Sequence, residues 1–274
     1  GSVGKTSTKE MLYAVLSQRF KTHKTQGNLN NELGVPLTLL SMPEDTEAAV
    51  IEMGISDFGE MTRLSEMVQP TICVLTIIGE CHLENLDDRD GVLKAKTEMF
   101  KNARENADFI RNGDDDKLST VKTVNGKKPV FFGLDAKNDF YAKNIKNSGD
   151  GKVLATLCFD NNNIDVEIPA IGTYMVTNAL AAAAAGKLLG LTDEEIANGV
   201  ASYKTVGSRA NVINTGKIKI IDDCYNANPT SVRASLDTLS NLDGRKVAIL
   251  GDMKELGSEE LKLHFDTGVY AKSK

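Results

Sequence analysis

The sequence predicts an α/β protein with a mostly parallel sheet, helices on both faces of that sheet, and an appended β-hairpin. A second α/β unit, which looks incomplete, follows at the C-terminal end. Three observations carry this prediction. Apolar strand-like runs alternate with helical periodicity, a glycine-rich loop opens the first helix, and a polar run at 160–163 separates two strand-like segments. Such alternation is typical of parallel sheets that are covered by helices.

The individual elements follow from short apolar runs and from apolar residues at helical spacing. The predicted strands of the sheets are residues 48–53, 71–77, 108–112, 130–133, 219–222 and 246–250. The predicted helices are residues 6–20, 92–106, 173–189, 193–202 and 229–239. Residues 152–159 and 164–168 flank Asp160-Asn161-Asn162-Asn163, which favours a hairpin turn.

We predict two domains, residues 1–205 and residues 206–274. The boundary is placed near Val206-Gly207-Ser208, where a new alternation of strands and helices begins. Gly1 already lies inside a loop that normally follows a strand, so the first domain is expected to lack its first strand. The second unit is short for a doubly wound domain, so it is expected to be partial.

Composition excludes several classes of protein. With 41% hydrophobic and 26% charged residues, the chain is typical of soluble globular proteins. No apolar run approaches the ~20 residues of a membrane span. A net charge of −6 without dense Lys/Arg runs gives no field that attracts nucleic acid. Four scattered cysteines without a CxxC pair fit a reducing compartment. We therefore expect a cytoplasmic monomer that acts on small molecules.

The first residues match the end of the phosphate-binding pattern G-x-x-x-x-G-K-[ST]. Glycines let backbone N–H groups point at phosphate oxygens, and the following helix adds a partial positive charge. The lysine of the pattern reaches the β- and γ-phosphates, and the threonine hydroxyl binds Mg²⁺. The alternative is a glycine turn that merely caps a helix. We predict a site for ATP and Mg²⁺ whose nucleotide contacts are Gly1, Ser2, Val3, Gly4, Lys5, Thr6 and Ser7.

Two further polar residues follow predicted strands. Glu52 stands at the end of strand 48–53, at the sheet edge where open α/β proteins bind ligands, so it is placed to hold Mg²⁺. His82 follows strand 71–77 and, as a neutral imidazole, would ligate a second cation. The alternatives are an acid that closes a strand in solvent and a structural histidine. From its helical pattern alone, Lys96 would be an ordinary solvated lysine.

Longer segments resemble the Mur ligases, a family of ATP-dependent amide-bond ligases, over almost the whole chain. These segments are GSVGKTSTKEM at 1–11, NLNNELGVPLT at 28–38, EMGISDFGEM at 52–61, AKTE at 95–98, NGDD at 112–115, DDCYNANPTS at 222–231 and GDMKELG at 251–257. Within the family, the second and the last two are most similar to members that join D-alanyl-D-alanine to UDP-N-acetylmuramoyl-tripeptide.

The resemblance implies roles for individual residues. Lys5 and Thr6 would bind the triphosphate and a first Mg²⁺, which Glu52 also serves. His82 would hold a second Mg²⁺, and Lys96 matches the lysine that many family members carry as a carbamate, its adduct with CO₂. The implied catalytic residues are thus Lys5, Glu52, His82 and Lys96, and the implied metal ligands are Thr6, Glu52, His82 and Lys96.

The resemblance also implies roles for residues further along the chain. Asn178 matches a residue that contacts adenine. Arg209 and Asp223 match residues of a Rossmann-like C-terminal domain that close over the nucleotide. Cys81 and Ser208 depart from the small residue and the glycine that the family usually has there.

The implied reaction forms an acyl phosphate and ADP, after which an amine displaces phosphate. We expect little ligation by this chain alone, because the family's domain that binds the UDP-sugar and the latter part of its C-terminal domain are absent from it. Two alternatives stay open: another Mur-type amide ligase such as folylpolyglutamate synthase, and a P-loop ATPase without ligase activity.

Overall fold

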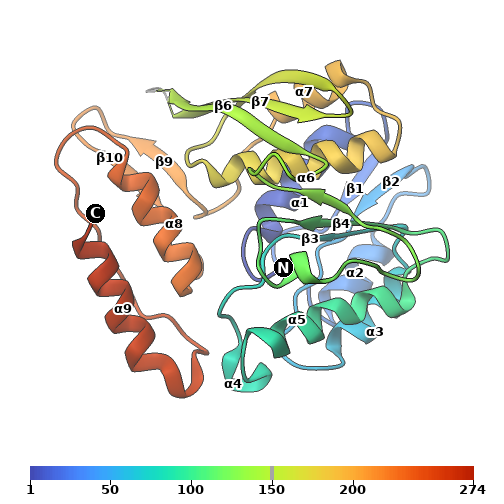
Figure 1. Cartoon of the computed structure of the whole chain (residues 1–274), viewed down its shortest axis with the longest axis horizontal. Helices are drawn as coiled ribbons and strands as arrows, with labels where there is room; N and C mark the ends of the chain where they lie inside the picture. Colours follow the sequence, from blue (N-terminus) through green and yellow to red (C-terminus); the bar gives the residue numbers. More distant parts are fainter. Residues whose placement is uncertain (149–150) are drawn as a thin grey trace.

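The computed structural model describes residues 1–148 and 151–274 (Figure 1). A larger α/β body contains the elements up to α7, and a smaller part with β9, β10, α8 and α9 lies beside it. The predicted α/β class is confirmed. No helix in the described ranges is long and apolar enough to cross a bilayer.

Parallel strands form the centre of the larger body. β1 (Thr22–Lys24) pairs with β2 (Ala48–Val50), and β4 (Asp108–Asn112) lies between β3 (Ile72–Leu75) and β5 (Val130–Phe132). Each of the four strands predicted in this region is present, although all but β4 are shorter than predicted. β1 was missed because it has only three residues, Thr22–Lys24, and none of them is an apolar residue that would mark a strand.

Helices cover both faces of these strands (Figure 1). One face carries α1 (Lys5–Leu16), α6 (Tyr174–Leu188) and α7 (Asp193–Ala201). The other face carries α2 (Gly34–Leu40), α3 (Glu60–Val68), α4 (Leu83–Leu86) and α5 (Arg89–Thr97). α5 continues into η1 (Glu98–Asn102), and η2 (Leu118–Thr120) follows β4. β4 serves both cores, because successive side chains of a strand point to opposite faces. Ile110 packs into the core around α1 and α6, and Phe109 packs into the core around α3 and α5.

The alanine-rich helix α6 is buried along most of its length. Its alanine-rich run from Ala179 to Ala185 lies in the core and lets α1 pack closely against it. A helix that is apolar on all sides is expected to be buried. α1 is thereby held between α6 and the sheet, which fixes the loop at its N-terminal end.

The predicted hairpin is confirmed. β7 (Lys152–Phe159) pairs antiparallel with β8 (Asn162–Ile168), and the turn residues Asp160 and Asn161 have φ of 48° and 63°. Positive φ at both central residues is the conformation of the tight hairpin turn that Asn and Asp favour. β6 (Tyr141–Ser148) pairs on the other side of β7 and was missed, because its sequence YAKNIKNS is mostly polar.

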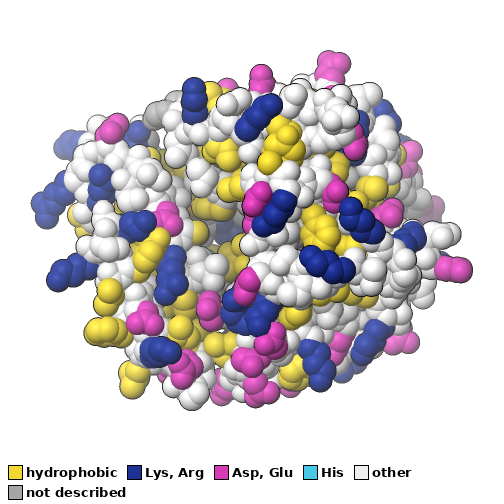
Figure 2. Space-filling model, in the orientation of Figure 1, with side chains coloured by type: hydrophobic (Ala, Val, Ile, Leu, Met, Phe, Trp, Pro, Cys, Tyr) yellow, Lys and Arg dark blue, Asp and Glu magenta, His cyan; other side chains and the backbone are white. Residues whose placement is uncertain are grey.

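The smaller part combines an antiparallel pair with helices. β9 (Asn211–Asn214) pairs with β10 (Lys219–Asp222), and α8 (Pro229–Ser240), η3 (Gly257–Glu259) and α9 (Glu260–Lys272) follow. Figure 2 shows hydrophobic side chains gathered at the lower left, over α9. Its exposed apolar residues are Leu261, Phe265 and Val269.

The predicted strand at 246–250 is wrong. These residues carry no regular structure, and Val247 and Ile249 are 65% and 94% exposed. A strand needs a neighbour that accepts its backbone hydrogen bonds. Among the described residues, β9 and β10 pair only with each other, so this apolar run has no strand edge to join.

Candidate active site

The start of α1 has the features of an anion site. Gly4 precedes the helix with a left-handed φ of 78°, and no side chain caps the first turn. The first N–H groups of a helix have no partner within it, and together with the helix dipole they attract anions. Lys5 Nζ curls back and donates to the carbonyl oxygen of Ser2 at 3.3 Å. The left-handed Gly4 and the uncapped first turn support the predicted phosphate loop, whose contacts with a nucleotide stay a prediction.

The loop is anchored on the residues that follow β3. The Ser2 N–H donates to the Ile77 carbonyl at 2.6 Å, and the Thr76 hydroxyl donates to the Val3 carbonyl at 2.6 Å. A Cβ atom on Gly1 would lie 2.0 Å from Thr76 Oγ1, so only glycine fits there. These contacts tie the loop to the strand that leads to His82.

Glu52 is the buried carboxylate next to this loop. Its Oε1 accepts hydrogen bonds from Thr6 Oγ1 at 3.1 Å and from Asn30 Nδ2 at 2.8 Å. Its Oε2 accepts no hydrogen bond from the described residues and lies 3.6 Å from Lys9 Nζ. The backbone N–H of Glu52 donates to Thr25 Oγ1 at 2.9 Å, which fixes the end of the strand.

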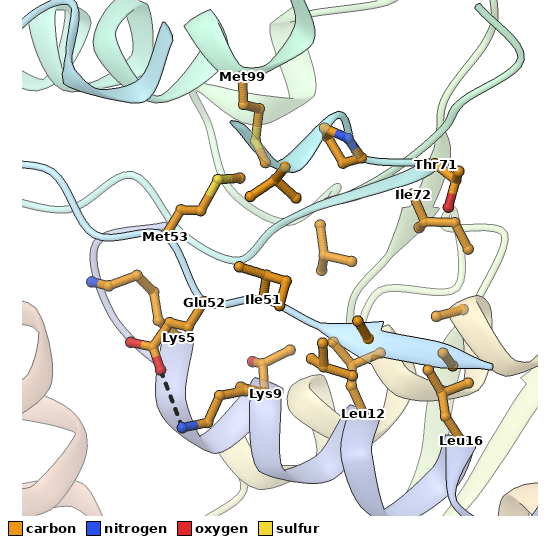
Figure 3. Close-up of a pocket in the computed structure, with 18 of the residues that line it drawn as sticks. Lys5, Lys9, Leu12, Leu16, Ile51, Glu52, Met53, Thr71, Ile72 and Met99 are labelled. Carbon is orange, nitrogen blue, oxygen red and sulfur yellow. Dashed lines mark ion pairs between the residues drawn. The ribbon is translucent and has the colours of Figure 1, made fainter. Parts of the chain in front are cut away.

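Figure 3 shows the Glu52 carboxylate between the side chains of Lys5 and Lys9. These residues form the polar end of a cavity of about 390 Å³. The remainder of the cavity is lined mainly by apolar residues of α1 and of the segments around β2 and β3, which belong to separate sheets. That apolar part is a gap between strands, so the polar end is the portion that suits a phosphate.

Thr6 and Glu52 have the chemistry of a magnesium site. Mg²⁺ prefers oxygen ligands and commonly takes only one or two from the protein, with phosphate and water supplying the rest. The Thr6 hydroxyl and the buried Oε2 of Glu52, which accepts no hydrogen bond from the described residues, are such ligands. A buried charged oxygen without a hydrogen bond is costly unless it meets a ligand. The residues present therefore fit a Mg²⁺ ion here, although the described chain holds no cluster of three or more His, Cys, Asp or Glu ligands.

Lys96 is buried, whereas its helical pattern alone suggested a solvated side chain. It is 2% exposed, on the face of α5 that also buries Val92 and Ala95. Burial lowers its pKa to about 8, Cys81 opposes this shift, and the charge of Lys5 adds to it. Within the described residues it has no hydrogen bond and no ion pair.

His82 immediately precedes α4 and has an unusual backbone conformation, φ 54°. Its Nδ1 lies 2.5 Å from Oε2 of Glu255. Burial lowers the pKa of His82; the negative charge of Glu255 opposes the shift, and the charges of Lys96 and Lys5 add to it. A lowered pKa favours the neutral imidazole, the form that binds metals. Lys5 is the common neighbour of this group, since it lies beside Glu52 and its charge acts on both His82 and Lys96.

Asn178, on α6, lies against the phosphate loop. Its Oδ1 accepts a hydrogen bond from Thr8 Oγ1 at 3.0 Å and would be 3.3 Å from a Cβ atom on Gly4. Its Nδ2 contacts the sulfur of Met175 at 3.4 Å. Asn178 therefore supports the loop from behind, and its contact with adenine stays a prediction.

Arg209 and Asp223 lie in the smaller part and form their own group. The Arg209 guanidinium stacks over the Tyr225 ring at 3.9 Å. Asp223 accepts hydrogen bonds from the Ala210 N–H at 3.0 Å and from the Ser235 hydroxyl. Burial raises the pKa of Asp223, and the charge of Arg209 partly offsets this.

Sequence reasoning missed Asn30, Lys9 and Tyr203. Asn30 stands in the asparagine-rich segment at 28–31, and Lys9 is one helical turn beyond Lys5, so both carried a usable signal. Burial raises the pKa of the Tyr203 hydroxyl, and the nearby side chains of Ser7 and Thr205 and the charge of Arg209 oppose this shift, so Tyr203 lies near both the phosphate loop and the smaller part. Nothing in the pattern around Tyr203 pointed to this proximity.

Comparison with known proteins agrees with this arrangement. The model of the Mur ligase middle domain matches residues 1–186, and that of the Mur ligase glutamate ligase domain matches residues 208–274. The chain is 39% identical over 271 residues to the UDP-N-acetylmuramoyl-tripeptide–D-alanyl-D-alanine ligase of Bacillus subtilis, covering 98% of this chain and 58% of that protein.

Two solved structures are similar along nearly the whole chain. MurF from Acinetobacter baumannii is 34% identical with a TM-score of 0.95, covering 100% of this chain and 60% of that one. The MurF ligase of Thermotoga maritima in complex with ADP is 32% identical with a TM-score of 0.91, covering 98% and 62%. The chain thus spans about 60% of the length of these relatives. Because the two family models together match most of its residues, the chain belongs to the Mur ligase family.

Proposed function

We propose that the protein is an ATP-dependent ligase that joins D-alanyl-D-alanine to UDP-N-acetylmuramoyl-tripeptide in peptidoglycan precursor synthesis. The observation that carries the proposal is the pairing of Thr6 with the buried Glu52 carboxylate beside Lys5. This pairing places a hydroxyl and a carboxylate where they suit a metal ion, next to a lysine that suits a triphosphate. The choice of substrates rests on relatives of that name, including the Bacillus subtilis protein at 39% identity.

The residues would act mainly by neutralising charge. The terminal carboxylate of the tripeptide attacks the γ-phosphorus, a new O–P bond forms, the bond to the β-phosphate oxygen breaks, and ADP leaves. The dipeptide amine then attacks the acyl carbon, loses a proton and expels phosphate. Since carboxylate and triphosphate are both anions, the first step depends on positioning and on charge stabilisation by Lys5 and the N–H groups that begin α1.

Mg²⁺ would add to this stabilisation, because when bound it neutralises charge on the phosphate oxygens. Thr6 and Glu52 would hold one ion, and His82 would contribute to a second. Among the remaining nucleotide contacts, Asn178 would approach the adenine, while Arg209 and Asp223 would close over the nucleotide from the smaller part. These roles are part of the proposal.

We also propose that Lys96 carries a carbamate. Its pKa of about 8 leaves about a tenth of the amine neutral at pH 7, far more than an ordinary lysine would have. The neutral amine would add to the carbon of CO₂ and release one proton. The resulting anion would compensate the positive charge of Lys5 and supply oxygen ligands near His82.

The proposal also includes the cellular compartment and the oligomeric state of the protein. The described cysteines Cys73, Cys81, Cys158 and Cys224 are all free, which fits a reducing cytoplasm. We propose a monomer; a measured molar mass in solution tests this directly. Likeness to folylpolyglutamate synthase of Lactobacillus casei, at 17% identity, concerns the fold alone.

The deciding experiment is a ligation assay with the complete protein, ATP and Mg²⁺. Product is followed by mass spectrometry for UDP-N-acetylmuramoyl-tripeptide with D-alanyl-D-alanine, and in parallel for folate with glutamate. We expect the dipeptide adduct together with ADP and phosphate in equal amounts. Glutamate addition to folate, or ATP hydrolysis that needs neither acceptor, would replace this proposal by one of its alternatives. The 274-residue chain alone should give little ligation.

A further inference from the structure

The smaller part of the molecule contacts the turn at 79–84, which leads from β3 into α4 and carries His82. The Leu83 N–H donates to the Glu255 carbonyl at 3.1 Å, and the Glu255 carboxylate lies 2.5 Å from Nδ1 of His82. Residue 255 therefore holds this turn by its backbone and by its side chain. It belongs to the segment 251–257 that precedes α9.

Both partners of this contact have backbone conformations that non-glycine residues rarely adopt. φ is 54° at His82 and 61° at Glu255. Such conformations persist where the surrounding structure fixes them, and they gather at functional sites. A Cβ atom on the neighbouring Gly257 would lie 3.4 Å from the backbone of Glu84, so the two segments are in close contact.

The contact leaves the second ring nitrogen of His82 available. Across the described chain, neither ring nitrogen of His82 makes a hydrogen bond of suitable geometry, but Nδ1 lies 2.5 Å from the Glu255 carboxylate while Nε2 has no charged neighbour of this kind. Histidines that bind metals commonly donate their other N–H to a carboxylate, which fixes the tautomer and the ring orientation. At 2.5 Å the Glu255 carboxylate is close enough to Nδ1 to take that role with a small rotation of the ring, and it comes from a different part of the chain than Lys5, Glu52 and Lys96.

We propose that Glu255 is a positioning residue that orients His82 toward the second cation, so that this cation site is complete only when the segment 251–257 is docked on α4. The inference rests on the proposed function, since it takes His82 as a ligand. It adds that formation of the second cation site depends on the docking of the smaller part.

A second contact between the same parts offers a matched control. Thr230 Oγ1, at the start of α8, donates to Oε2 of Glu80 at 3.1 Å and does not touch His82. Thr230→Ala removes a polar tie between the two parts and leaves the histidine contact intact. It therefore separates docking in general from orientation of His82.

The test is Mn²⁺ binding to the complete protein with a non-hydrolysable ATP analogue, followed by electron paramagnetic resonance, which requires no turnover. The variants are Glu255→Ala, Glu255→Gln, Thr230→Ala and His82→Ala, with circular dichroism to verify the fold. We expect two bound ions in the unchanged protein and loss of one in His82→Ala. Glu255→Ala should weaken that same ion ~10–100-fold without affecting the other ion. Glu255→Gln should restore part of the affinity, because an amide oxygen still accepts from Nδ1–H.

The outcomes distinguish this inference from the function on which it rests. Unchanged affinity for both ions in Glu255→Ala overturns the positioning role alone. Equal weakening in Glu255→Ala and Thr230→Ala also overturns it, because the carboxylate would then serve only for docking. If His82→Ala still binds two ions as tightly as the unchanged protein, the role of His82 fails first, and the inference fails with it.

Discussion

The Thr6 hydroxyl donates a hydrogen bond of 3.1 Å to the Glu52 carboxylate, across 46 positions of sequence. Thr6 is fixed by the first turn of α1, and Glu52 follows β2, so the contact joins the phosphate loop to the edge of the sheet. It leaves Oε2 of Glu52 without a hydrogen bond beside Lys9 and Lys5. Replacing Glu52 by glutamine therefore removes the negative charge of the site with little change in its shape.

Glu52→Gln in the complete protein should lower the ligation rate ~10²–10³-fold, the usual cost of removing one well-placed electrostatic contact. The amide oxygen can still accept from Thr6, so the fold should persist while the affinity for the metal–nucleotide complex falls. Steady-state kinetics at varied Mg²⁺ measure both effects. Glu47→Gln, an exposed carboxylate that pairs with the Lys21 N–H, is the control and should stay near full activity. Retention of more than a tenth of the activity in Glu52→Gln would contradict the assigned role.

Lys9→Met should destabilise the protein by about 3–5 kcal/mol, as expected when one partner of a buried charge cluster is removed. Lys9 is 3% exposed, donates to the Thr25 carbonyl at 2.8 Å, and lies 3.2 Å from Glu10 and 3.6 Å from Glu52. Its loss leaves buried carboxylate oxygens uncompensated. Urea unfolding measures the change.

An exposed lysine provides the comparison for Lys9. Lys21 pairs with Asp45 at 2.9 Å, with both side chains about two-thirds exposed. Lys21→Met should change the free energy of unfolding by less than ~1 kcal/mol, because exposed ion pairs contribute little. A similar small effect for Lys9→Met would show that the buried carboxylates are compensated in another way.

The sequence allowed prediction of the residues whose position follows from local pattern. Glu52 was placed because a carboxylate ends an apolar strand, and the loop from Gly1 to Thr6 because its spacing is distinctive. Helix α8 was placed by its helical periodicity; the structure adds a local start, because the Asn228 side chain accepts from the Ser231 N–H and Pro229 is the first helical residue. These signals are local, and tertiary packing does not override them.

The features that sequence reasoning missed depend on contacts between distant segments. The burial of Lys96 depends on which face of α5 meets the sheet, and the pattern of one helix cannot distinguish a buried lysine from a solvated one. The run at 246–250 is as apolar as a strand, but strand formation requires a neighbouring edge. The influence of Ser7 on the pKa of Tyr203 joins positions that no local rule relates.

Gly199→Ala should destabilise the protein by about 1–3 kcal/mol, the usual cost of overpacking. A Cβ atom there would lie 2.4 Å from the Val15 Cα, in the contact between α1 and α7. The matched change is Gly268→Ala in α9, where no atom lies within 4 Å of the added carbon. That change should stabilise the protein by about 0.5–1 kcal/mol, because glycine inside a helix costs conformational entropy. Thermal unfolding of both variants measures the difference; equal effects would mean that α1 and α7 pack less closely.

Lys96→Ala should lose most ligase activity and regain part of it when a short-chain carboxylic acid such as acetate or propionate is added. The acid would occupy the space of the removed side chain and supply the anion that a carbamate otherwise provides. The rescue should rise with acid concentration and saturate. Glu52→Gln is the control, since added acid has no vacated space to fill there. Failure of every short acid to restore activity would favour an unmodified lysine.

Lys96→Met should raise the free energy of unfolding at pH 7 by up to about 3 kcal/mol, and this gain should shrink as the pH rises. Burial lowers the pKa of Lys96 from 10.5 to about 8. Below pH 8 the amine is charged in both states, so the folded protein bears the full cost of burying that charge. Between pH 8 and 10.5 the unfolded chain binds more protons than the folded one. The stability of the unchanged protein therefore rises with pH by about 1.4 kcal/mol per unit until the cost of burying the charge is gone.

The measurement compares the unchanged protein with Lys96→Met in CO₂-free buffer at pH 7, 8, 9 and 10, so that other titrating groups cancel in the difference. A gain that stays constant with pH would mean that Lys96 is not buried as a charged amine, and re-equilibration with CO₂ should narrow the gap at pH 7 to 8 if the carbamate forms.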